Sequence, residues 1–197
     1  GRISSIVNQT SSSLEWLNSA RETLKKLPSI DYSNPCIVVT GAPNVGKSAL
    51  ISSLSTGNPE VASYPFTTKQ LHLGHFEHRR LRYQIVDTPG LLDRPMKERN
   101  SIELQAIAAL EHIGNIVLFV IDADKGFTKQ DKTIANHIIK EGKPMVILVN
   151  KWDLTSDSDI SADSFMLDMF DTFRLLEHYP ILFVSALTKR RISNILS

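Results

Sequence analysis

The spacing of apolar residues changes near residue 35. Before that point apolar side chains recur every three or four residues, as on one face of a helix, at Ile3, Ile6, Val7, Leu14, Leu17, Leu24 and Leu27. Pro28 and the polar stretch 29–35 end this pattern. The sequence therefore predicts one amphipathic N-terminal helix with a linker over residues 1–34 and a separate domain over residues 35–197.

Short apolar runs alternate with helical patterns in the second part of the chain. Continuous apolar runs are typical of strands buried on both faces of a parallel sheet, and they occur at 36–40, 116–121 and 145–149. Residues 80–87 and 180–185 show a similar pattern, and residues 69–78 alternate like a more exposed strand. Helical spacing occupies most of the intervening segments, at 47–55, 101–112, 128–141 and 162–177.

The connections between these segments predict the fold class. Only the strands at 69–78 and 80–87 are joined by a short turn, so we expect this pair to be antiparallel. The other strands need helical crossovers, which predicts a three-layer α/β domain with a mostly parallel six-stranded sheet and one antiparallel edge strand. Residues 55–68 show neither a helical nor a strand period, and the last helix is expected to be cut short at Ser197.

Composition adds that the chain is an ordinary folded protein. Hydrophobic residues make up 42% and charged residues 22%, which are close to globular averages. The 22 Lys and Arg residues nearly balance the 21 Asp and Glu residues, so net charge favours neither a nucleic acid nor a membrane partner. The single cysteine, Cys36, excludes an internal disulfide. No apolar run reaches the roughly 20 residues of a membrane span, and we expect a soluble cytoplasmic protein.

Four of the expected strands are followed by short motifs of glycine and polar residues. Ligands bind at these strand ends in open α/β sheets. The first group is "GAPNVGKS" (41–48), between a buried strand and a helix. Its spacing predicts a phosphate-binding loop, in which Gly41 and Gly46 let backbone N–H groups face the phosphates. Lys47 would reach the β- and γ-phosphates, and Ser48 would ligate Mg²⁺. The alternative is a glycine turn with a solvated lysine.

The second group is "DTPG", which begins at Asp87. Its carboxylate can hold a magnesium-bound water, and the Gly90 N–H can meet the γ-phosphate. Alone this sequence is an ordinary turn, but its position some forty residues after a phosphate loop makes it specific. In the segment 55–68, a threonine can complete the magnesium shell only when a γ-phosphate is present, and we favour Thr68 over Thr67 for this switch.

The third group, "NKWD" (150–153), separates guanine from adenine. Asp153 can accept hydrogen bonds from the N1–H and the exocyclic amine of guanine, a donor pair that adenine lacks. Asn150 would tie this loop to the phosphate loop, and the Lys151 stem would cover the base. These residues favour a GTPase over the competing hypothesis of an ATP-using enzyme with the same phosphate loop, for which this motif would be incidental.

The fourth group, "SAL" (185–187), follows the last expected strand, where the Ala186 N–H could donate to guanine O6. The sequence thus predicts a Ras-like P-loop GTPase domain that binds GTP or GDP with Mg²⁺. The expected metal ligands are Ser48, Thr68 and Asp87. The expected nucleotide-binding residues are Gly41, Asn44, Val45, Gly46, Lys47, Ser48, Ala49, Asn150, Lys151, Asp153, Ser185, Ala186 and Leu187.

These motifs resemble the translation-factor-related GTPases of the Obg and Era type. Residues 1–122 resemble the Nog subfamily, through stretches such as "SLEWLNSARETLKKLPSID" and "EVASYPFTTKQLHLGHFEHRRLRYQIVDTPGLLD". Residues 116–197 resemble the second GTPase domain of Der, through "LFVIDADKGFTKQDKTIANHIIKEGKPMVILVNKWDL". The two resemblances predict a chimera, natural or engineered. They imply large ribosomal subunit or rRNA partners, and we expect a monomer with no membrane or DNA partner.

The resemblance also raises the question of what orients the attacking water. Leu91 occupies the position at which Ras-type proteins have a glutamine, and a leucine cannot orient water. Asn44 matches the position that ligates K⁺ in Era-type enzymes, which implies a potassium ion as one solution. A group from a partner is the other solution. The alternative for Asn44 is a loop residue that is hydrogen-bonded to its own backbone.

The expected function is therefore slow hydrolysis of GTP to GDP and phosphate by a molecular switch. The expected catalytic residues are Lys47, Thr68, Gly90 and Asn44. The competing hypothesis is a switch or scaffold, or an engineered chimera, that binds GTP or GDP with negligible turnover.

Overall fold

The computed structural model describes most of the expected domain. The described residues are Asn18, Asp31, 33–57, 60–63, 70–87, 114–155 and 160–196. The helices expected at 3–27 and 101–112 lie outside these residues. No helix in the described part of the chain is long and apolar enough to cross a bilayer.

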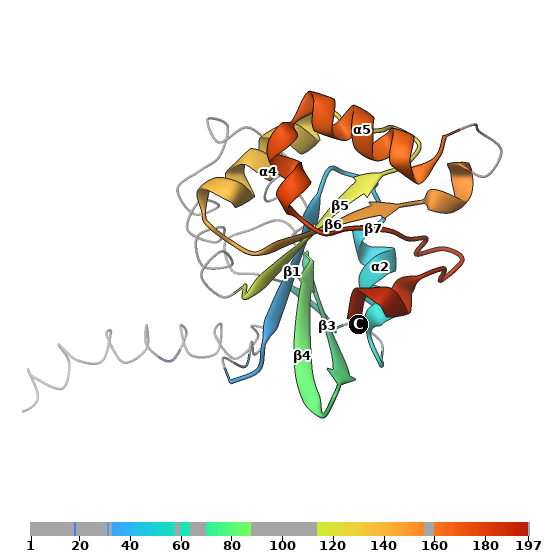
Figure 1. Ribbon diagram of the computed structural model, residues 1–197. Coiled ribbons are helices and arrows are strands. Elements are labelled where there is room, and N and C mark those ends of the chain that lie inside the picture. The colour runs from blue at the N-terminus through green and yellow to red at the C-terminus, as the bar shows by residue number, and fades with distance from the viewer. Residues whose placement is uncertain are drawn as a thin grey trace, which may run out of the picture.

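The described residues form one sheet of seven strands (Figure 1). In chain order the strands are β1 (Cys36–Gly41), β2 (Glu60–Ser63), β3 (Gln70–His78), β4 (Leu81–Asp87), β5 (Ile116–Asp122), β6 (Met145–Asn150) and β7 (Ile181–Phe183). Their spatial order is β2-β3-β4-β1-β5-β6-β7. The five strands from β4 to β7 in this order are parallel, whereas β3 runs antiparallel to both of its neighbours. The predicted α/β fold class is confirmed.

The sheet has one strand more than the six expected. The additional strand, β2, lies in the segment 55–68, which has no strand period in the sequence. A strand of four residues is too short to show a clear alternation, and β2 pairs only with β3, for example at Val61 opposite His72. The edge of the sheet is therefore β2, and β3 lies inside it.

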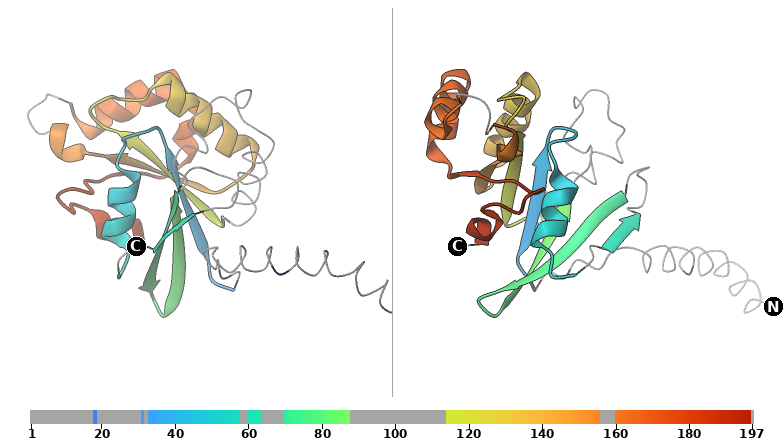
Figure 2. Two further views of the ribbon diagram at one scale, coloured as in Figure 1. Left: turned by 180° about the vertical axis from the view of Figure 1, so that it is seen from behind. Right: turned by 90° about the vertical axis from the view of Figure 1, so that its right-hand side faces the viewer.

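Helices cover both faces of the sheet. Helix α2 (Lys47–Leu54) lies on one face, while α4 (Lys129–Lys140) and α5 (Ala162–Thr172) lie side by side on the other (Figures 1 and 2). Short 3-10 helices follow at Trp152–Thr155, Arg174–His178 and Ile192–Leu196. The apolar side chains of α2 share a core with Leu118 and Val120 of β5. Those of α4 and α5 share the other core with Phe119 and Ile121 of the same strand. Because alternate residues face opposite cores, β5 needs a continuous apolar run.

The registers of the parallel strands bring several polar strand ends together. Asp122 at the end of β5 lies opposite Asn150 at the end of β6. Gly41 at the end of β1 lies opposite Val120, and Asp87 at the end of β4 lies opposite Val39. The carboxyl edge of the sheet therefore gathers these residues from four different strands, at the place where open α/β sheets bind ligands.

Candidate functional site

The loop between β1 and α2, which the sequence predicts to bind phosphate, contains three residues with a positive φ. Gly41, Asn44 and Gly46 have φ values of 148°, 65° and 95°, in the left-handed region that glycine adopts without cost. A Cβ atom at Gly41 would clash with the carbonyl oxygen of Val120, and one at Gly46 would clash with the side-chain amide of Asn150. Both glycines are therefore needed for the close approach of this loop to neighbouring strands.

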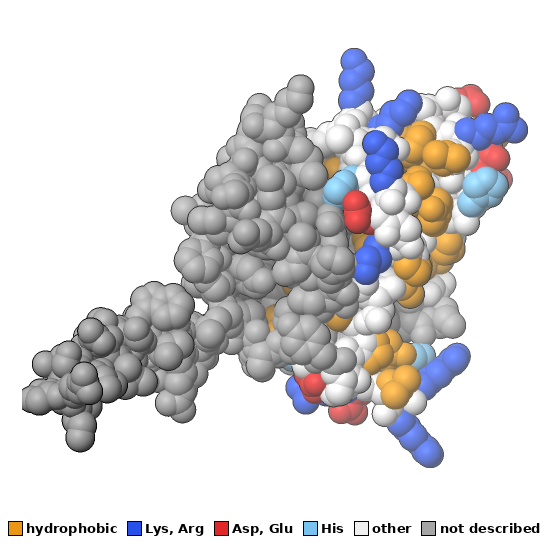
Figure 3. Space-filling view, turned by 90° about the vertical axis from the view of Figure 1, so that its left-hand side faces the viewer, with side chains coloured by type: hydrophobic (Ala, Val, Ile, Leu, Met, Phe, Trp, Pro, Cys, Tyr) orange, Lys and Arg blue, Asp and Glu red, His pale blue; other side chains and the backbone are white. Residues whose placement is uncertain are grey.

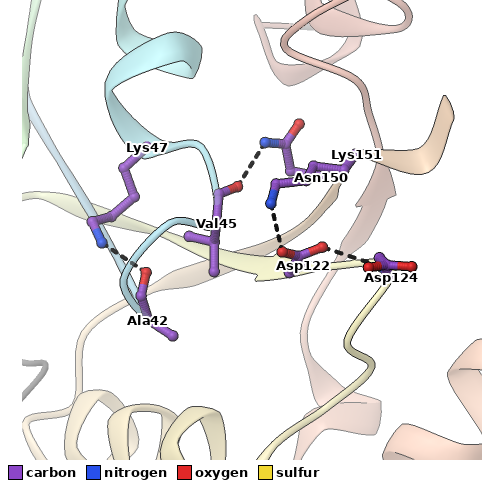
Figure 4. A network of polar contacts seen from close by, with 7 residues as sticks. All are labelled: Ala42, Val45, Lys47, Asp122, Asp124, Asn150 and Lys151. Atoms are coloured by element: carbon purple, nitrogen blue, oxygen red, sulfur yellow. Dashed lines mark hydrogen bonds and ion pairs between the residues drawn. The ribbon is translucent and has the colours of Figure 1, made fainter. Parts of the chain in front are cut away.

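Lys47 is buried at the start of α2 and curls back over the loop. Its Nζ donates to the carbonyl oxygens of Gly41 at 2.7 Å and Ala42 at 2.9 Å (Figure 4 shows the second bond). These bonds hold the ammonium group beside the backbone that the sequence assigns to phosphate binding. A buried ammonium at this place can neutralise phosphate charge that water would otherwise screen.

Ser48 and Asp87, both expected as magnesium ligands, lie in direct contact. The Ser48 Oγ donates to Asp87 Oδ2 at 2.8 Å, which joins the first turn of α2 to the end of β4. Asp87 is fully buried at the carboxyl edge of the sheet. One hydroxyl and one carboxylate fit Mg²⁺, because this ion takes oxygen ligands and binds through one or two carboxylates together with substrate phosphates.

Asn150 joins the phosphate loop to the loop after β7. Its Nδ2 donates to the Val45 carbonyl oxygen at 2.8 Å, and its Oδ1 accepts from the Ala186 N–H at 2.9 Å (Figure 4 shows the first bond). Asn150, Val45 and Ala186 are all buried. The predicted tie between Asn150 and the phosphate loop is thus present, and the N–H expected to reach guanine O6 also contacts this amide.

Lys151 forms an ion pair with Asp122, a residue outside the motifs singled out in the sequence. Its Nζ lies 2.6 Å from Asp122 Oδ2, and Asp122 also accepts from the Asp124 N–H at 3.1 Å (Figure 4). Asp122 is only 3% exposed, and Lys151 has a positive φ of 63°. Asp122 ends a strand just as Asp87 does, so the strand-end argument applied to β5 could have identified it.

Aromatic packing fixes the expected base-recognition loops. The Trp152 ring lies 4.4 Å from Phe183 and 5.9 Å from Phe165 between ring centroids. The backbone N–H of Trp152 donates to the Val184 carbonyl oxygen. Asp153 follows Trp152 and is half-buried. In the "SAL" segment, Ser185 is buried and accepts from the Thr188 N–H at 3.1 Å, whereas the Leu187 side chain is 83% exposed. Leu187 can therefore contribute little more than its backbone.

The remaining predicted residues divide into two sets. In the phosphate loop and α2, Val45 is buried, while Asn44 and Ala49 are exposed. The other set lies outside the described residues and comprises Thr67, Thr68, Gly90 and Leu91. Of the expected catalytic residues, the structure thus places Lys47 and Asn44, in the same loop.

Comparison with known families agrees with this geometry. Residues 36–151 match the family described as "50S ribosome-binding GTPase". The matched region begins at β1 and ends at Lys151, so it contains the phosphate loop, Asp87 and Asp122. Guanine nucleotide together with Mg²⁺ is what this family and fold imply.

Several curated relatives match nearly the whole chain. Nucleolar GTP-binding protein 1 of Caenorhabditis elegans is 37% identical over 201 residues, which cover 98% of this chain and 28% of the relative. The protein of the same name from Saccharomyces cerevisiae is 37% identical over 83% of this chain and 26% of its own length. The chain thus spans about a quarter to a third of the curated relatives it matches.

Solved structures give the same result. A crystal structure of nucleolar GTP-binding protein 1 from Plasmodium falciparum matches with a TM-score of 0.65 and 36% identity, and the match covers 85% of each chain. The G domain of the FeoB iron transporter of Thermotoga maritima has a TM-score of 0.61 at 19% identity over 82% of this chain and 93% of its own, which shows the fold alone.

Two expectations are corrected by these comparisons. A single relative aligns across 98% of the chain, so a chimera with a junction at 116–122, and a Der-type origin of the second half, are unsupported. The expected cytoplasmic location is contradicted, because the matching relatives are named nucleolar GTP-binding proteins.

Proposed function

The chain belongs to the family of 50S ribosome-binding GTPases, and we propose that this domain binds GTP with Mg²⁺ and hydrolyses it slowly to GDP and phosphate. The observation that carries the proposal is the buried Asn150 side chain, which joins the phosphate loop at Val45 to the base loop at Ala186. A nucleotide bound across both loops would place its phosphates at the first and its base at the second.

The phosphate end is assigned to residues of the β1–α2 loop and β4. Lys47 moves its ammonium from the Gly41 and Ala42 carbonyls to the β- and γ-phosphates when the nucleotide binds. Ser48 and Asp87 would hold Mg²⁺, which would supply positive charge beside the phosphate groups. Thr68 and Gly90 are proposed to report the γ-phosphate from the segments flanking these strands.

The base end is assigned to the segments after β6 and β7. Asp153 accepts from the two guanine donors, and the aliphatic stem of Lys151 lies along the base while Asp122 holds its ammonium. The Ala186 N–H donates to guanine O6 and shares this bond with Asn150 Oδ1, since one N–H can serve two acceptors. An ATP-binding protein would leave the Asp153 carboxylate without these donors.

The attacking water is proposed to depend on a potassium ion or on a group from a partner. Asn44 is exposed in the phosphate loop and has a left-handed backbone. A cation held there would stabilise charge between the β- and γ-phosphates, as an arginine finger does. Without such a group we expect a turnover rate on the order of 10⁻⁴–10⁻² s⁻¹.

The test is GTP hydrolysis with Mg²⁺ in potassium chloride and in sodium chloride at equal ionic strength. Stimulation by potassium that disappears in Asn44→Ala assigns the ion to Asn44. Equal and very slow rates in both salts, with tight GTP binding, assign the aligning group to a partner. Failure to bind GTP at all would contradict the proposed function.

We further propose that the whole protein acts in assembly of the large ribosomal subunit, with rRNA or pre-ribosomal particles as partners and the nucleolus as its location. The family description and the names of the relatives support this proposal. We expect this domain to be a monomer with no DNA partner. Size-exclusion chromatography with light scattering, with and without GDP, tests the oligomeric state.

A further inference from the structure

We propose that the turn between β3 and β4 is an RNA-binding site at which Arg79 and Arg80 contact phosphate groups. This inference goes beyond the nucleotide cycle, because the turn contains none of the residues assigned to GTP or Mg²⁺.

The turn has a conformation that arginine adopts at a cost. His78 pairs with Leu81 across the hairpin, so Arg79 and Arg80 alone form the connection. Their φ values are 49° and 67°, which identifies a two-residue turn with two left-handed positions. Such turns strongly prefer Asn-Gly, because a Cβ atom in the left-handed region crowds the following carbonyl oxygen. Backbone strain of this kind clusters at functional sites.

The arginine side chains point into solvent. Arg79, Arg80 and Arg82 are exposed, and within the described part of the chain none of the three forms an ion pair. Together with Glu77, they give the tip a net charge of +2 with the histidines uncharged. Leu81 is 53% exposed beside them. Figure 3 shows Lys and Arg side chains projecting at the lower end of the molecule, where Figure 1 places the β3–β4 turn.

The hairpin below the tip is rigid. Six consecutive residue pairs join β3 to β4, from Leu73 opposite Val86 to His78 opposite Leu81. The Phe76 and Tyr83 rings stack across the two strands with centroids 5.1 Å apart and an interplanar angle of 5°. Because this ribbon is ordered before binding, only the arginine side chains lose freedom when a ligand is bound.

These features favour RNA over other anionic partners. A guanidinium group matches phosphate with two parallel hydrogen bonds, and a pair of adjacent arginines suits the regular phosphate spacing of a nucleic acid strand. A two-residue turn is narrow enough to follow a groove, and the exposed Leu81 can contact ribose or a base face. The family description as ribosome-binding also favours RNA. An acidic membrane or an acidic protein would also attract the arginine charges, but neither has a groove that fits the narrow turn.

The test compares three double variants by fluorescence anisotropy with a labelled RNA duplex that carries a single-stranded overhang. Arg79→Asn with Arg80→Gly removes both charges and supplies the preferred turn residues. Arg79→Lys with Arg80→Lys keeps the charges. The control, Lys129→Gln with Lys140→Gln, removes two exposed charges from α4, which Figure 1 places at the opposite end of the molecule from the turn.

We expect the Asn-Gly variant to bind RNA about tenfold more weakly or worse, and to reduce the slope of log affinity against log salt by about 1.4–1.8, as loss of two phosphate contacts requires. Its melting temperature should rise by about 2–4 °C, since the strain is relieved. The Lys-Lys variant should keep most of the salt slope, and the α4 control should keep the affinity of the unmodified chain.

Three results would overturn the proposal. One is RNA binding equal in the Asn-Gly variant and the unmodified chain. Another is an equal loss in the α4 control, which would indicate net charge rather than the turn. A third is turn-dependent binding to phosphatidylserine vesicles or polyglutamate with none to RNA. GTP affinity measured on the same variants separates this proposal from the nucleotide function, because we expect it to be unchanged.

Discussion

Asn150 is the residue that makes one site out of segments far apart in the sequence. Its amide contacts Val45 and Ala186, which lie 105 and 36 positions away in the chain. Both partners are backbone groups in the buried interior, so each would cost about 1–3 kcal/mol if its hydrogen bond were lost without a replacement. The residue therefore supports the fold and, in the proposed function, the nucleotide site as well.

Replacement of Asn150 by alanine should lower the free energy of unfolding by about 2–4 kcal/mol, because it leaves the Val45 carbonyl and the Ala186 N–H unpaired. Urea unfolding measures this change. Asn136→Ala, at an exposed position of α4, is the matched control and should change stability by less than about 0.5 kcal/mol. Similar stabilities for the two variants would show that the bridge is dispensable.

Cys36 makes stability depend on pH in the alkaline range. Burial raises the pKa of this thiol from 9.0 to about 11. The folded state therefore holds the proton more tightly than the unfolded state does. The stabilisation is complete below pH 9 and is lost as the pH rises from 9 to 11, because the unfolded chain ionises first. The full effect is about 2–3 kcal/mol.

The measurement is urea unfolding of the unmodified chain and of Cys36→Ala at several values between pH 8 and pH 11. Other groups titrate in this range, so the difference between the two proteins is the relevant quantity. We expect the advantage of the unmodified chain to shrink as the pH rises. A difference that stays constant with pH would contradict the assignment to Cys36.

At the scale of elements, α4 and α5 begin with the same capping arrangement in different surroundings. Thr128 accepts from the Asp131 N–H and donates to the Asp131 carboxylate, and Ser161 forms the equivalent pair with Ser164. Asp131 is 2% exposed, and burial raises the pKa of its carboxyl group. The Thr128 hydroxyl at the start of α4 therefore also donates a hydrogen bond to a buried carboxyl group, whereas the cap of α5 is exposed.

Thr128→Ala should consequently destabilise the protein by about 1–2 kcal/mol, and Ser161→Ala by about 0.5–1 kcal/mol. The larger value follows because the alanine removes a hydroxyl donor from the buried Asp131. Equal losses in urea unfolding would show that the buried acid adds nothing to the cap.

The strands that are buried on both faces could be predicted from the sequence, because burial requires a continuous run of apolar residues. The strands β1, β5 and β6 are buried on both faces, so their apolar runs identify them within one residue. Strand β2 was missed because its only determinant is pairing with β3. The helix expected at 162–177 ends at Thr172, because Phe173 has φ −152° and ψ 88°, and a 3-10 helix follows at Arg174–His178. The break occurs without a proline or glycine that would mark it in the sequence.

The site followed the same division. The motif residues Lys47, Ser48 and Asn150 lie at the carboxyl edge of the sheet, as their positions in the sequence predict. Their roles in nucleotide binding stay predictions. Asp122 lies at a strand end as Asp87 does, and that position could have identified it. Its ion pair with Lys151, however, depends on the pairing of β5 with β6, which no motif describes. The roles of Thr68 and Gly90 stay predictions, since both lie outside the described residues.

At the scale of the whole molecule, one ligand is expected to connect the two halves of the sheet. The phosphate groups of a nucleotide would contact the β1–α2 loop, and its base would contact the loops after β6 and β7. A ligand that binds only the folded state raises stability by RT ln(1 + [L]/Kd), about 2.7 kcal/mol at a hundredfold excess over Kd.

GDP with Mg²⁺ at that excess should therefore raise the melting temperature by about 5–11 °C, as followed by circular dichroism. Chelation of Mg²⁺ with EDTA should reduce the shift, because Ser48 and Asp87 then lose the ion that links them to the phosphates. An identical shift with and without Mg²⁺ would contradict the assignment of these residues to the metal.

The central claim is that this site selects guanine through Asp153. Its most direct test is the affinity of the unmodified chain and of Asp153→Asn for GTP and ATP, measured by titration with fluorescent analogues in the presence of Mg²⁺. The account predicts that the unmodified chain prefers GTP by a factor on the order of 10² or more, and that the variant loses most of this preference through weaker GTP binding. An unchanged preference for GTP in Asp153→Asn would contradict it.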